Sequence, residues 1–281
     1  MARAAVNVLV ALIVVLALIA ALSRVLGSGA SEPGIRHFTP ASQDSGAFAP
    51  GIRYFTPASH LHCRPLPPLP CRDDVARAAE TIKVTGVGAE IGVNVGWFAA
   101  KNFRVWSGRY ILVDAWGHRS GDKGPPDLNS PDESSHRDRF KQAMAATDEW
   151  ASRRDVRKGL STEVAKSVSD NELDWVYIDA LHTYEAALAD IRAWYPKVRE
   201  CGIVSGDDYG DQKDTPFLSA ELQERGFGSI AREFGWGVIS AVQNFTQELG
   251  IELHVTWHTG PTSCYPHPAW YFLKPPSVQS A

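Results

Sequence analysis

The chain has 281 residues, of which 44% are hydrophobic and 21% are charged. This composition is typical of a globular protein and excludes a disordered or fibrous chain. The net charge of −4 and the pI near 6.1 argue against a nucleic-acid surface as the main function, so we expect no nucleic-acid partner. The length suffices for one domain of ordinary to large size together with appendages.

The N-terminal residues differ from the rest of the chain. Residues 4–22 are apolar except for Asn7, and Arg3 and Arg24 flank this run. A helix of this length, at ~1.5 Å per residue, nearly spans a hydrocarbon core of about 30 Å. We therefore expect an uncleaved transmembrane signal anchor over residues 1–26. A cleavable signal peptide is the alternative, although its apolar core normally has only about 7–15 residues.

The charges beside the apolar run predict an orientation. A short N-terminal tail that carries Arg3 would stay in the cytosol, which makes a type II single-pass protein with its bulk in the lumen of the secretory pathway. Cleavage near residues 27–31 would instead give a secreted protein. Cys63 and Cys71 flank the Pro-rich stretch CRPLPPLPC, and they could close a small disulfide loop in such an oxidising compartment.

Residues 27–72 have the composition of a stalk, because Gly, Ser, Pro and Ala dominate. The segment PGIRHFTPAS at 33–42 returns as PGIRYFTPAS at 50–59. Two copies are too few for a solenoid, so a duplication within a tolerant linker is the simplest interpretation. The folded domain is expected over residues 73–281.

From Asp73 onward, apolar strand patterns alternate with helical patterns. This alternation predicts a doubly wound α/β domain with a mostly parallel, Rossmann-like sheet, and two late strands without a clear helix between them predict an antiparallel edge. The expected strands are 86–92, 109–116, 155–159, 174–179, 202–209, 251–257 and 269–274, and the expected helices are 73–84, 97–106, 138–150, 161–168 and 183–195.

Such sheets bind ligands at the carboxyl ends of their strands. The first strand ends in EIGVNVG, which contains Glu90, Gly92, Asn94 and Gly96. We expect Gly92 to permit a tight turn and Gly96 to permit close approach of backbone and helix. The spacing is not the dinucleotide fingerprint G-x-G-x-x-G. Asp114 ends the second strand, where a carboxylate can accept hydrogen bonds from ribose hydroxyls.

These segments resemble a known family. AEIGVNVGWFAA followed by YILVDAW resembles the glycine-rich motif and the acidic second-strand end of class I S-adenosylmethionine-dependent methyltransferases. LDWVYIDALHTYEAALADIRAWYPKVRECGIVSGDDY is similar to the family that includes macrocin-type sugar O-methyltransferases, as are the later WGVISAVQNF and WYFLK. The resemblance covers residues 75–275 and implies O-methylation of a sugar, a glycan or another small hydroxyl acceptor.

The resemblance also implies roles for individual residues toward S-adenosylmethionine. The methionine end of the cofactor would lie along the glycine-rich loop, the ribose against the acidic strand end, and the adenine beside the turn after the third strand. These positions are Glu90, Gly92, Asn94 and Gly96 for the loop, Asp114 for the ribose and Ser161 for the adenine. Ser161 suits an N-cap equally well.

Acidic residues also follow two later strands. Asp179 ends one strand, and Asp207 and Asp208 end the next. If these strands are neighbours, three carboxylates converge and would repel one another unless a cation is bound. The family pattern implies binding of Mg²⁺ or another divalent cation by these residues. It also implies a catalytic role for Asp179 and for His182, the latter as the base or as a residue that binds the acceptor. The alternative is a solvated loop, with Thr183 capping the next helix.

One position departs from the family pattern. The turn commonly reads Asp-Gly-Asp-His, whereas here it reads Asp179-Ala180-Leu181-His182. Loss of the second acidic residue at Leu181 leaves open a catalytically inactive, methyltransferase-like binding module. A nicotinamide-dependent oxidoreductase is the other alternative, although the glycine spacing argues against it. The polar insert 120–136 is either a lid over the acceptor or a disordered excursion.

Overall fold

The computed structural model describes residues 63–117, 133–211, 231, 234–256 and 267–277. The predicted anchor, most of the stalk and most of the 120–136 insert lie outside these residues and stay predictions. Within the described ranges, no helix is both long enough and apolar enough to cross a bilayer.

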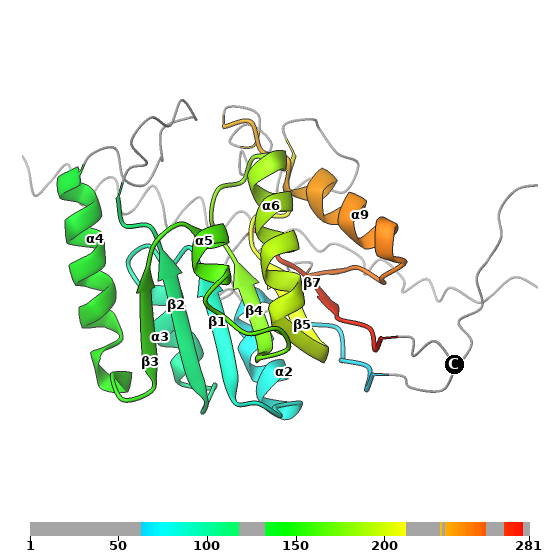
Figure 1. Ribbon diagram of the computed structural model, residues 1–281, viewed down its shortest axis with the longest axis horizontal. Coiled ribbons are helices and arrows are strands. Elements are labelled where there is room, and N and C mark those ends of the chain that lie inside the picture. The colour runs from blue at the N-terminus through cyan, green and yellow to red at the C-terminus, as the bar shows by residue number, and fades with distance from the viewer. Residues whose placement is uncertain (1–62, 118–132, 212–230, 232–233, 257–266, 278–281) are drawn as a thin grey trace, which may run out of the picture. The chain divides into compact units, whose positions relative to one another are not determined.

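A seven-stranded sheet forms the centre of the domain, in the order β3-β2-β1-β4-β5-β7-β6 (Figure 1). The first five strands are parallel, whereas β7 is antiparallel to β5 and β6 is antiparallel to β7. The predicted Rossmann-like sheet with an antiparallel edge is therefore confirmed. The strands are β1 (Val87–Ile91), β2 (Arg109–Asp114), β3 (Arg154–Lys158), β4 (Leu173–Ile178), β5 (Val198–Gly206), β6 (His254–Val255) and β7 (Trp270–Leu273).

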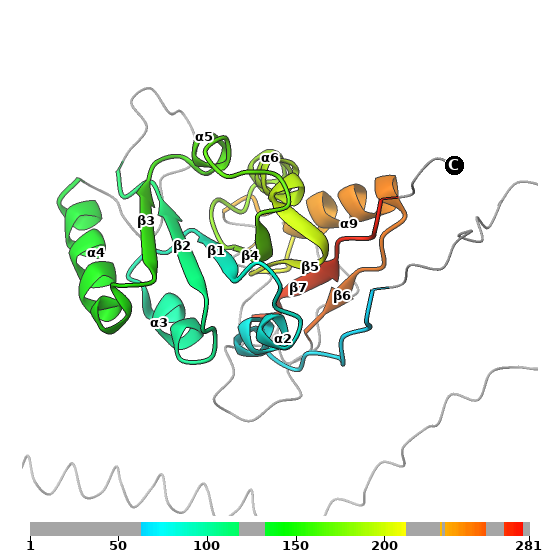
Figure 2. The ribbon, with the colours of Figure 1, turned by 60° about the horizontal axis from the view of Figure 1, so that its bottom comes forward.

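Helices cover both faces of the sheet (Figure 2). One face carries α5, α6 and α9, and the other carries α2, α3 and α4. Short 3₁₀ turns join several of these elements. The helices are α2 (Val75–Thr81), α3 (Trp97–Phe103), α4 (Glu133–Ala146), α5 (Ser161–Ala165), α6 (Tyr184–Trp194) and α9 (Val238–Leu249), and the turns are η1 (Arg72–Asp74), η2 (Asp148–Trp150) and η3 (Tyr195–Lys197).

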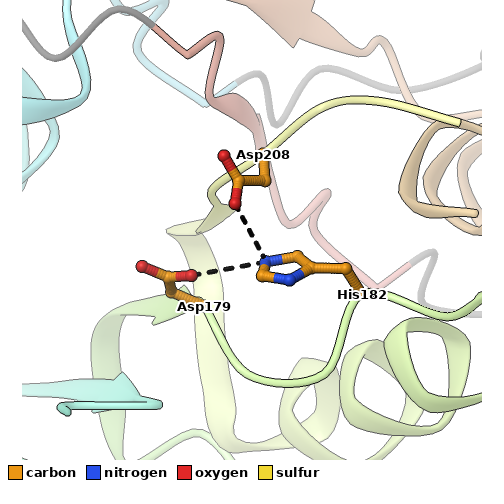
Figure 3. A group of neighbouring side chains, drawn as sticks. All are labelled: Asp179, His182 and Asp208. Atoms are coloured by element: carbon orange, nitrogen blue, oxygen red, sulfur yellow. Dashed lines mark ion pairs between the residues drawn. The ribbon is translucent and has the colours of Figure 1, made fainter. Parts of the chain in front are cut away.

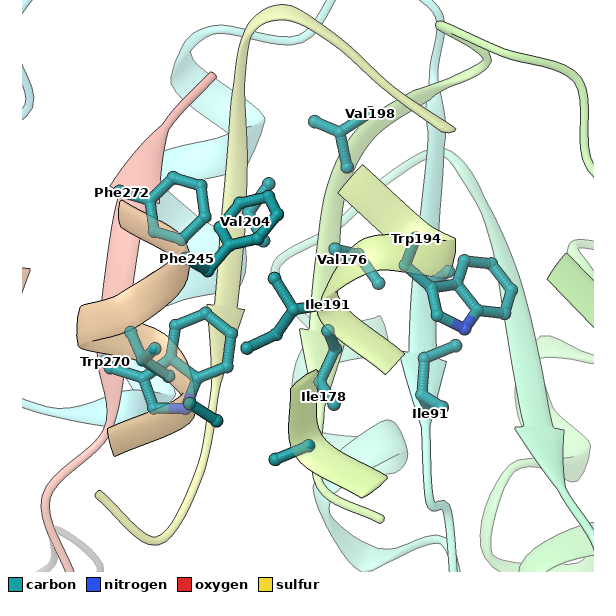
Figure 4. Close-up of a cluster of buried hydrophobic side chains, with 14 of the residues drawn as sticks. Ile91, Val176, Ile178, Ile191, Trp194, Val198, Val204, Phe245, Trp270 and Phe272 are labelled. Carbon is teal, nitrogen blue, oxygen red and sulfur yellow. The ribbon is translucent and has the colours of Figure 1, made fainter. Parts of the chain in front are cut away.

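Two apolar cores result from this layering, one on each side of the sheet. Every residue of β4 is buried, because helices cover both of its faces. Figure 4 shows the core beneath α6 and α9, in which Ile191 of α6 lies between Phe245 of α9 and Ile178 of β4, and Trp194 of α6 lies beside Ile91 of β1. Ile191 is fully buried, and Tyr184, Leu188 and Tyr195, which recur at helical spacing, pack against the same core.

Residues 63–72, which the sequence assigned to the end of the stalk, pack on the domain. Leu69 is buried in the core on the α2 side of the sheet, and its backbone N–H donates to the Tyr271 hydroxyl at 3.0 Å. A disulfide joins Cys63 to Cys201 of β5. The expected Cys63–Cys71 loop is therefore wrong, because the two cysteines form separate disulfides. Sequence proximity suggested that pair, whereas the fold brings β5 to Cys63.

The strand order reverses between β1 and β4, so the crevice that such sheets use for ligands opens there. The first residue after each of three strands continues the hydrogen-bond ladder. Gly92 N–H donates to Val113 at 2.8 Å, Asp179 N–H to Ile91 at 2.7 Å and Asp207 N–H to Ile178 at 3.0 Å. The loops that carry the predicted site residues therefore start side by side at one edge of the sheet.

Candidate active site

The glycine-rich loop after β1 needs glycine at two positions. Gly92 has a φ of +91°, and a Cβ there would lie 1.8 Å from the Asp179 carbonyl oxygen. Gly96 has a φ of +77°, and its Cβ would lie 2.9 Å from the Cα of Ala143 in α4. The expected tight turn and close helix approach are both confirmed, because no side chain fits at either position.

Asp114 organises this loop through its carboxylate. Its Oδ2 accepts the backbone N–H of Asn94 and its Oδ1 accepts that of Trp116, both at 2.8 Å. Asn94 has a φ of +53°, and its side-chain oxygen accepts a hydrogen bond from Arg139 of α4. Carboxylate oxygens can accept hydrogen bonds from ribose hydroxyls, and this role for Asp114 stays a prediction.

Glu90 is enclosed beneath the loop, with only 1% of its surface exposed. Its carboxyl accepts a hydrogen bond of 2.8 Å from the Tyr110 hydroxyl, which in turn accepts one from Asn102. Burial raises the pKa of Glu90 to about 8, so this side chain is mainly protonated at neutral pH. Contact of Glu90 with the methionine end of the cofactor stays a prediction.

Two predicted helix caps have different outcomes. Leu160 is the N-cap residue of α5, so the expected capping role for Ser161 is wrong. Ser161 is the first helical residue, and its hydroxyl accepts a 2.9 Å hydrogen bond from the Trp194 indole N–H. Its proximity to adenine stays a prediction. Thr183 occupies the N-cap position of α6 as expected, although its side chain makes no capping hydrogen bond.

His182 lies between two carboxylates at the end of β4 and β5 (Figure 3). Its Nε2 is 3.4 Å from Asp179 Oδ1 and 3.5 Å from Asp208 Oδ2. The three side chains offer one ligand atom each within 4.8 Å of one another. His182 Nε2 is a buried atom without a hydrogen bond of good geometry, as expected for a nitrogen that can bind a third group.

Asp207 does not join this trio, although the sequence placed it with the metal ligands. Its Oδ2 pairs with the guanidinium of Arg72, and only 2% of its side chain is exposed. The same Arg72 Nη1 lies 3.9 Å from Asp179 Oδ2. The structure therefore brings together Asp179, His182 and Asp208 and pairs Asp207 with an arginine.

Residues from the C-terminal part of the chain complete the surroundings of the trio. The His182 carbonyl accepts the Gly237 N–H at 2.8 Å, and the imidazole packs on the Trp236 ring with centroids 4.9 Å apart. His267 Nδ1 lies 2.5 Å from Asp208 Oδ1. Sequence reasoning missed the roles of Arg72, Trp236 and His267, because no local motif surrounds them.

The carboxylates set the charge state of the imidazole. Burial lowers the pKa of His182, but Asp179 and Asp208 outweigh burial and raise that pKa above its ordinary value. Burial raises the pKa of Asp208, but His267, His182 and Arg72 outweigh it and lower that pKa. Asp208 is consequently ionised at neutral pH, and His182 is an imidazole that binds its proton more tightly than usual.

One family model matches the middle of the chain. Residues 87–209, which run from β1 to just past Asp208, match the family model described as a methyltransferase domain. This part of the chain is similar to that family. No curated protein matches the sequence.

Several solved structures are similar to this chain at low sequence identity. A protein from Corynebacterium glutamicum is 12% identical, with 76% of this chain and 85% of that chain covered and a TM-score of 0.47. An O-methyltransferase from Bacillus cereus, solved with SAH, is 15% identical, with 71% and 80% covered and a TM-score of 0.44. A putative O-methyltransferase from Nostoc punctiforme is 15% identical, with 71% and 55% covered and a TM-score of 0.47. These values say nothing about the acceptor.

Proposed function

We propose that this chain is an S-adenosylmethionine-dependent methyltransferase that methylates a hydroxyl oxygen, with His182 as the base. The observation that carries the proposal is the position of His182 Nε2 between Asp179 and Asp208, 3.4 and 3.5 Å from their oxygens. This nitrogen stands at the sheet edge of a methyltransferase domain, beside the loop that starts at Gly92.

The cofactor would lie over the carboxyl ends of β1 and β2. Gly92 and Gly96 let this loop pass close to Asp179 and Ala143, and the methionine end would lie along the loop held in this position. Asp114 is already held by two backbone N–H groups and would accept the ribose hydroxyls. Such a preformed cradle lowers the entropic cost of holding the sulfonium in line with an acceptor.

The reaction needs a proton acceptor beside the attacking oxygen. The acceptor oxygen forms a bond to the methyl carbon while the methyl–sulfur bond breaks, and the electron pair of that bond stays on sulfur to give the thioether product. The hydroxyl proton passes to His182 Nε2, whose new positive charge Asp179 and Asp208 stabilise. His182 must be neutral beforehand, so its raised pKa predicts a rate that increases with pH.

Assistance by a divalent cation is a second candidate mechanism. The observation that favours it is the convergence of donor atoms from Asp179, His182 and Asp208 within 4.8 Å. The expected set with Asp207 does not fit, because Arg72 is paired with that carboxylate. A bound cation would lower the pKa of the acceptor hydroxyl, as metals do for water. If Asp179, His182 and Asp208 together bound the cation, the imidazole would be a metal ligand and not the base.

The acceptor and the compartment complete the proposal. A sugar, a glycan or another small hydroxyl compound would bind near His182, on a domain anchored to a membrane and facing the lumen. The apolar run at residues 4–22 supports the anchor, and the Cys63–Cys201 disulfide supports an oxidising compartment. Secretion after cleavage would satisfy the same two observations.

The test is calorimetric titration of the full-length chain with S-adenosylmethionine and with NAD. The proposal predicts that the chain binds S-adenosylmethionine and does not bind NAD. Binding of NAD alone would indicate an oxidoreductase. Transfer from methyl-labelled cofactor to a panel of sugars and phenols, with Mg²⁺, with Mn²⁺ and with chelator, then separates the mechanisms. Loss of turnover with chelator would favour the cation, whereas unchanged turnover would favour His182 alone. Binding without any turnover would indicate the inactive module.

A further inference from the structure

We infer that Arg72 takes the place on Asp207 that a divalent cation would otherwise take, so that this site carries a built-in positive charge. The inference rests on the proposed function, because it concerns the same site. The inference adds Arg72 to the site, a residue that lies in neither the glycine-rich loop nor the strand-end segments.

The first observation is the pattern of contacts around one guanidinium. Arg72 Nη1 pairs with Asp207 Oδ2 and lies 3.9 Å from Asp179 Oδ2. One group thus bridges two of the three aspartates that the sequence assigned to a metal. The other oxygen of Asp179 faces His182, so Arg72 holds this carboxylate from the side away from the imidazole.

The second observation is how firmly the guanidinium is held. The side chain of Arg72 is 13% exposed, and its guanidinium lies 4.6 Å from the centre of the Phe98 ring in α3. Asp207 is buried to an extent that a lone carboxylate would not tolerate, because a buried charge needs a partner. The pair is therefore a permanent part of the folded site.

The third observation is the segment that delivers Arg72, which we call the strap and define as residues 63–74. Its first residue, Cys63, is bonded to Cys201 of β5, and Cys71 beside the arginine is buried and disulfide-bonded too. Between them, the Leu69 N–H donates to the Tyr271 hydroxyl. Fixed at several points, the strap cannot withdraw Arg72 without loss of these contacts.

The charge balance shows what Arg72 does to a cation. Asp179, Asp207 and Asp208 carry three negative charges when ionised, and Arg72 neutralises one of them permanently. A divalent cation at Asp207 would have to displace the guanidinium, and one at Asp179 would lie close to it, where like charges repel strongly in a partly buried site. Arg72 therefore excludes Asp207 from any ligand set and weakens binding at the remaining donors.

The test measures Mn²⁺ binding by calorimetry on the full-length chain, without cofactor or acceptor. Arg72→Gln should bind Mn²⁺ at least about tenfold more tightly than the wild type, because it frees Asp207 and removes a positive charge. The double variant Arg72→Gln, Asp207→Asn should lose most of this increase in Mn²⁺ affinity. Arg77→Gln, which changes an exposed arginine one turn further on, should bind as the wild type does.

Equal or weaker Mn²⁺ binding by folded Arg72→Gln would overturn the inference, as would a gain that persists in the double variant. If Arg72→Gln does not fold, thermal unfolding decides instead. Addition of Asp207→Asn to Arg72→Gln should then restore a folded protein with nearly the unfolding temperature of Asp207→Asn alone, because a neutral amide needs no counter-ion, and a double variant that also fails to fold would overturn the inference. Titration with S-adenosylmethionine tests the proposed function separately, since it depends on the loop at Gly92 and not on Mn²⁺.

Discussion

The two ends of β4 each carry an aspartate paired with an arginine, yet the two ends are built differently. At the amino end, Asp174 is fully buried and accepts hydrogen bonds from Val84 N–H at 2.8 Å and Gly86 N–H at 2.6 Å, and it pairs with Arg199 at 2.6 Å. At the carboxyl end, Asp179 lies 3.9 Å from Arg72 and 3.4 Å from His182.

The difference separates a structural cluster from the cluster that we propose to be reactive. Every oxygen of Asp174 has close donors, and these hydrogen bonds outweigh burial and lower its pKa. At the other end, His182 Nε2 and Asp207 Oδ1 are buried atoms without a hydrogen-bond partner. Buried polar groups are normally satisfied, so a ligand near His182 and Asp207 would complete these two atoms. The proposed active site thus lies at the opposite end of β4 from this structural cluster.

The largest effect on stability should come from Gly92→Ala, with Gly86→Ala as its matched control. Both glycines have positive φ, but a Cβ at Gly86 meets nothing within 4 Å, whereas one at Gly92 meets the Asp179 carbonyl at 1.8 Å. Gly86→Ala should cost about 1–2 kcal/mol. Gly92→Ala should cost at least about 4 kcal/mol and abolish cofactor binding. Similar denaturant midpoints for the two variants would contradict the close approach.

The second effect should come from Asp174→Ala, which leaves Arg199 buried without its partner. We expect a loss of about 3–5 kcal/mol in the free energy of unfolding. Because the folded pKa of Asp174 is lowered, its contribution is present above the unfolded pKa and is lost as pH falls through the folded pKa. Urea unfolding of the wild type and the variant at pH 7 and pH 3 measures both the loss of stability and its dependence on pH. The cofactor affinity of the folded fraction should not change. A changed affinity would show that Asp174 at the amino end of β4 affects the site at its carboxyl end.

The third effect concerns Glu90 and depends on pH. The pKa of Glu90 in the folded protein is about 8, above its value in the unfolded chain. Its contribution to the free energy of unfolding is therefore present at low pH and is lost as pH rises through about 8. Glu90→Gln should therefore be more stable than the wild type by about 2–4 kcal/mol at pH 9 and nearly equal to it at pH 4. A pH-independent difference between the two unfolding curves would show that Glu90 titrates normally.

The smallest effect on stability should come from His182→Gln, under about 1 kcal/mol at pH 8. Its effect on rate should be large, about 10²–10⁴-fold for any acceptor that turns over. The wild-type rate should rise with pH through the raised pKa of His182, and the variant should lose that rise. His254→Gln in β6, whose ring stacks on Tyr271, is the control. Equal rates for both variants would exclude His182 as the base.

Sequence patterns predicted the fold well because they depend on local physics. Apolar, β-branched strands such as β4 and the stripe around Ile191 indicate a covered sheet before any tertiary contact is known. Strand-end aspartates were predictable for the same reason. The partners of those aspartates were not. Arg72 precedes Asp207 by 135 residues, and no periodicity relates the two. The disulfide of Cys63 was misassigned because spacing along the chain carries no information about distance in the fold.

The reversed direction of β7 has a consequence for how sites in such sheets are found. Parallel strands deliver their following residues to one edge, as β4 and β5 do with Asp179 and Asp208. An antiparallel strand starts at the edge where its neighbours finish, so it delivers the residue that precedes it, and His267 stands three positions before Trp270. Candidate catalytic residues in such a sheet are therefore found just after the parallel strands and just before the antiparallel strand.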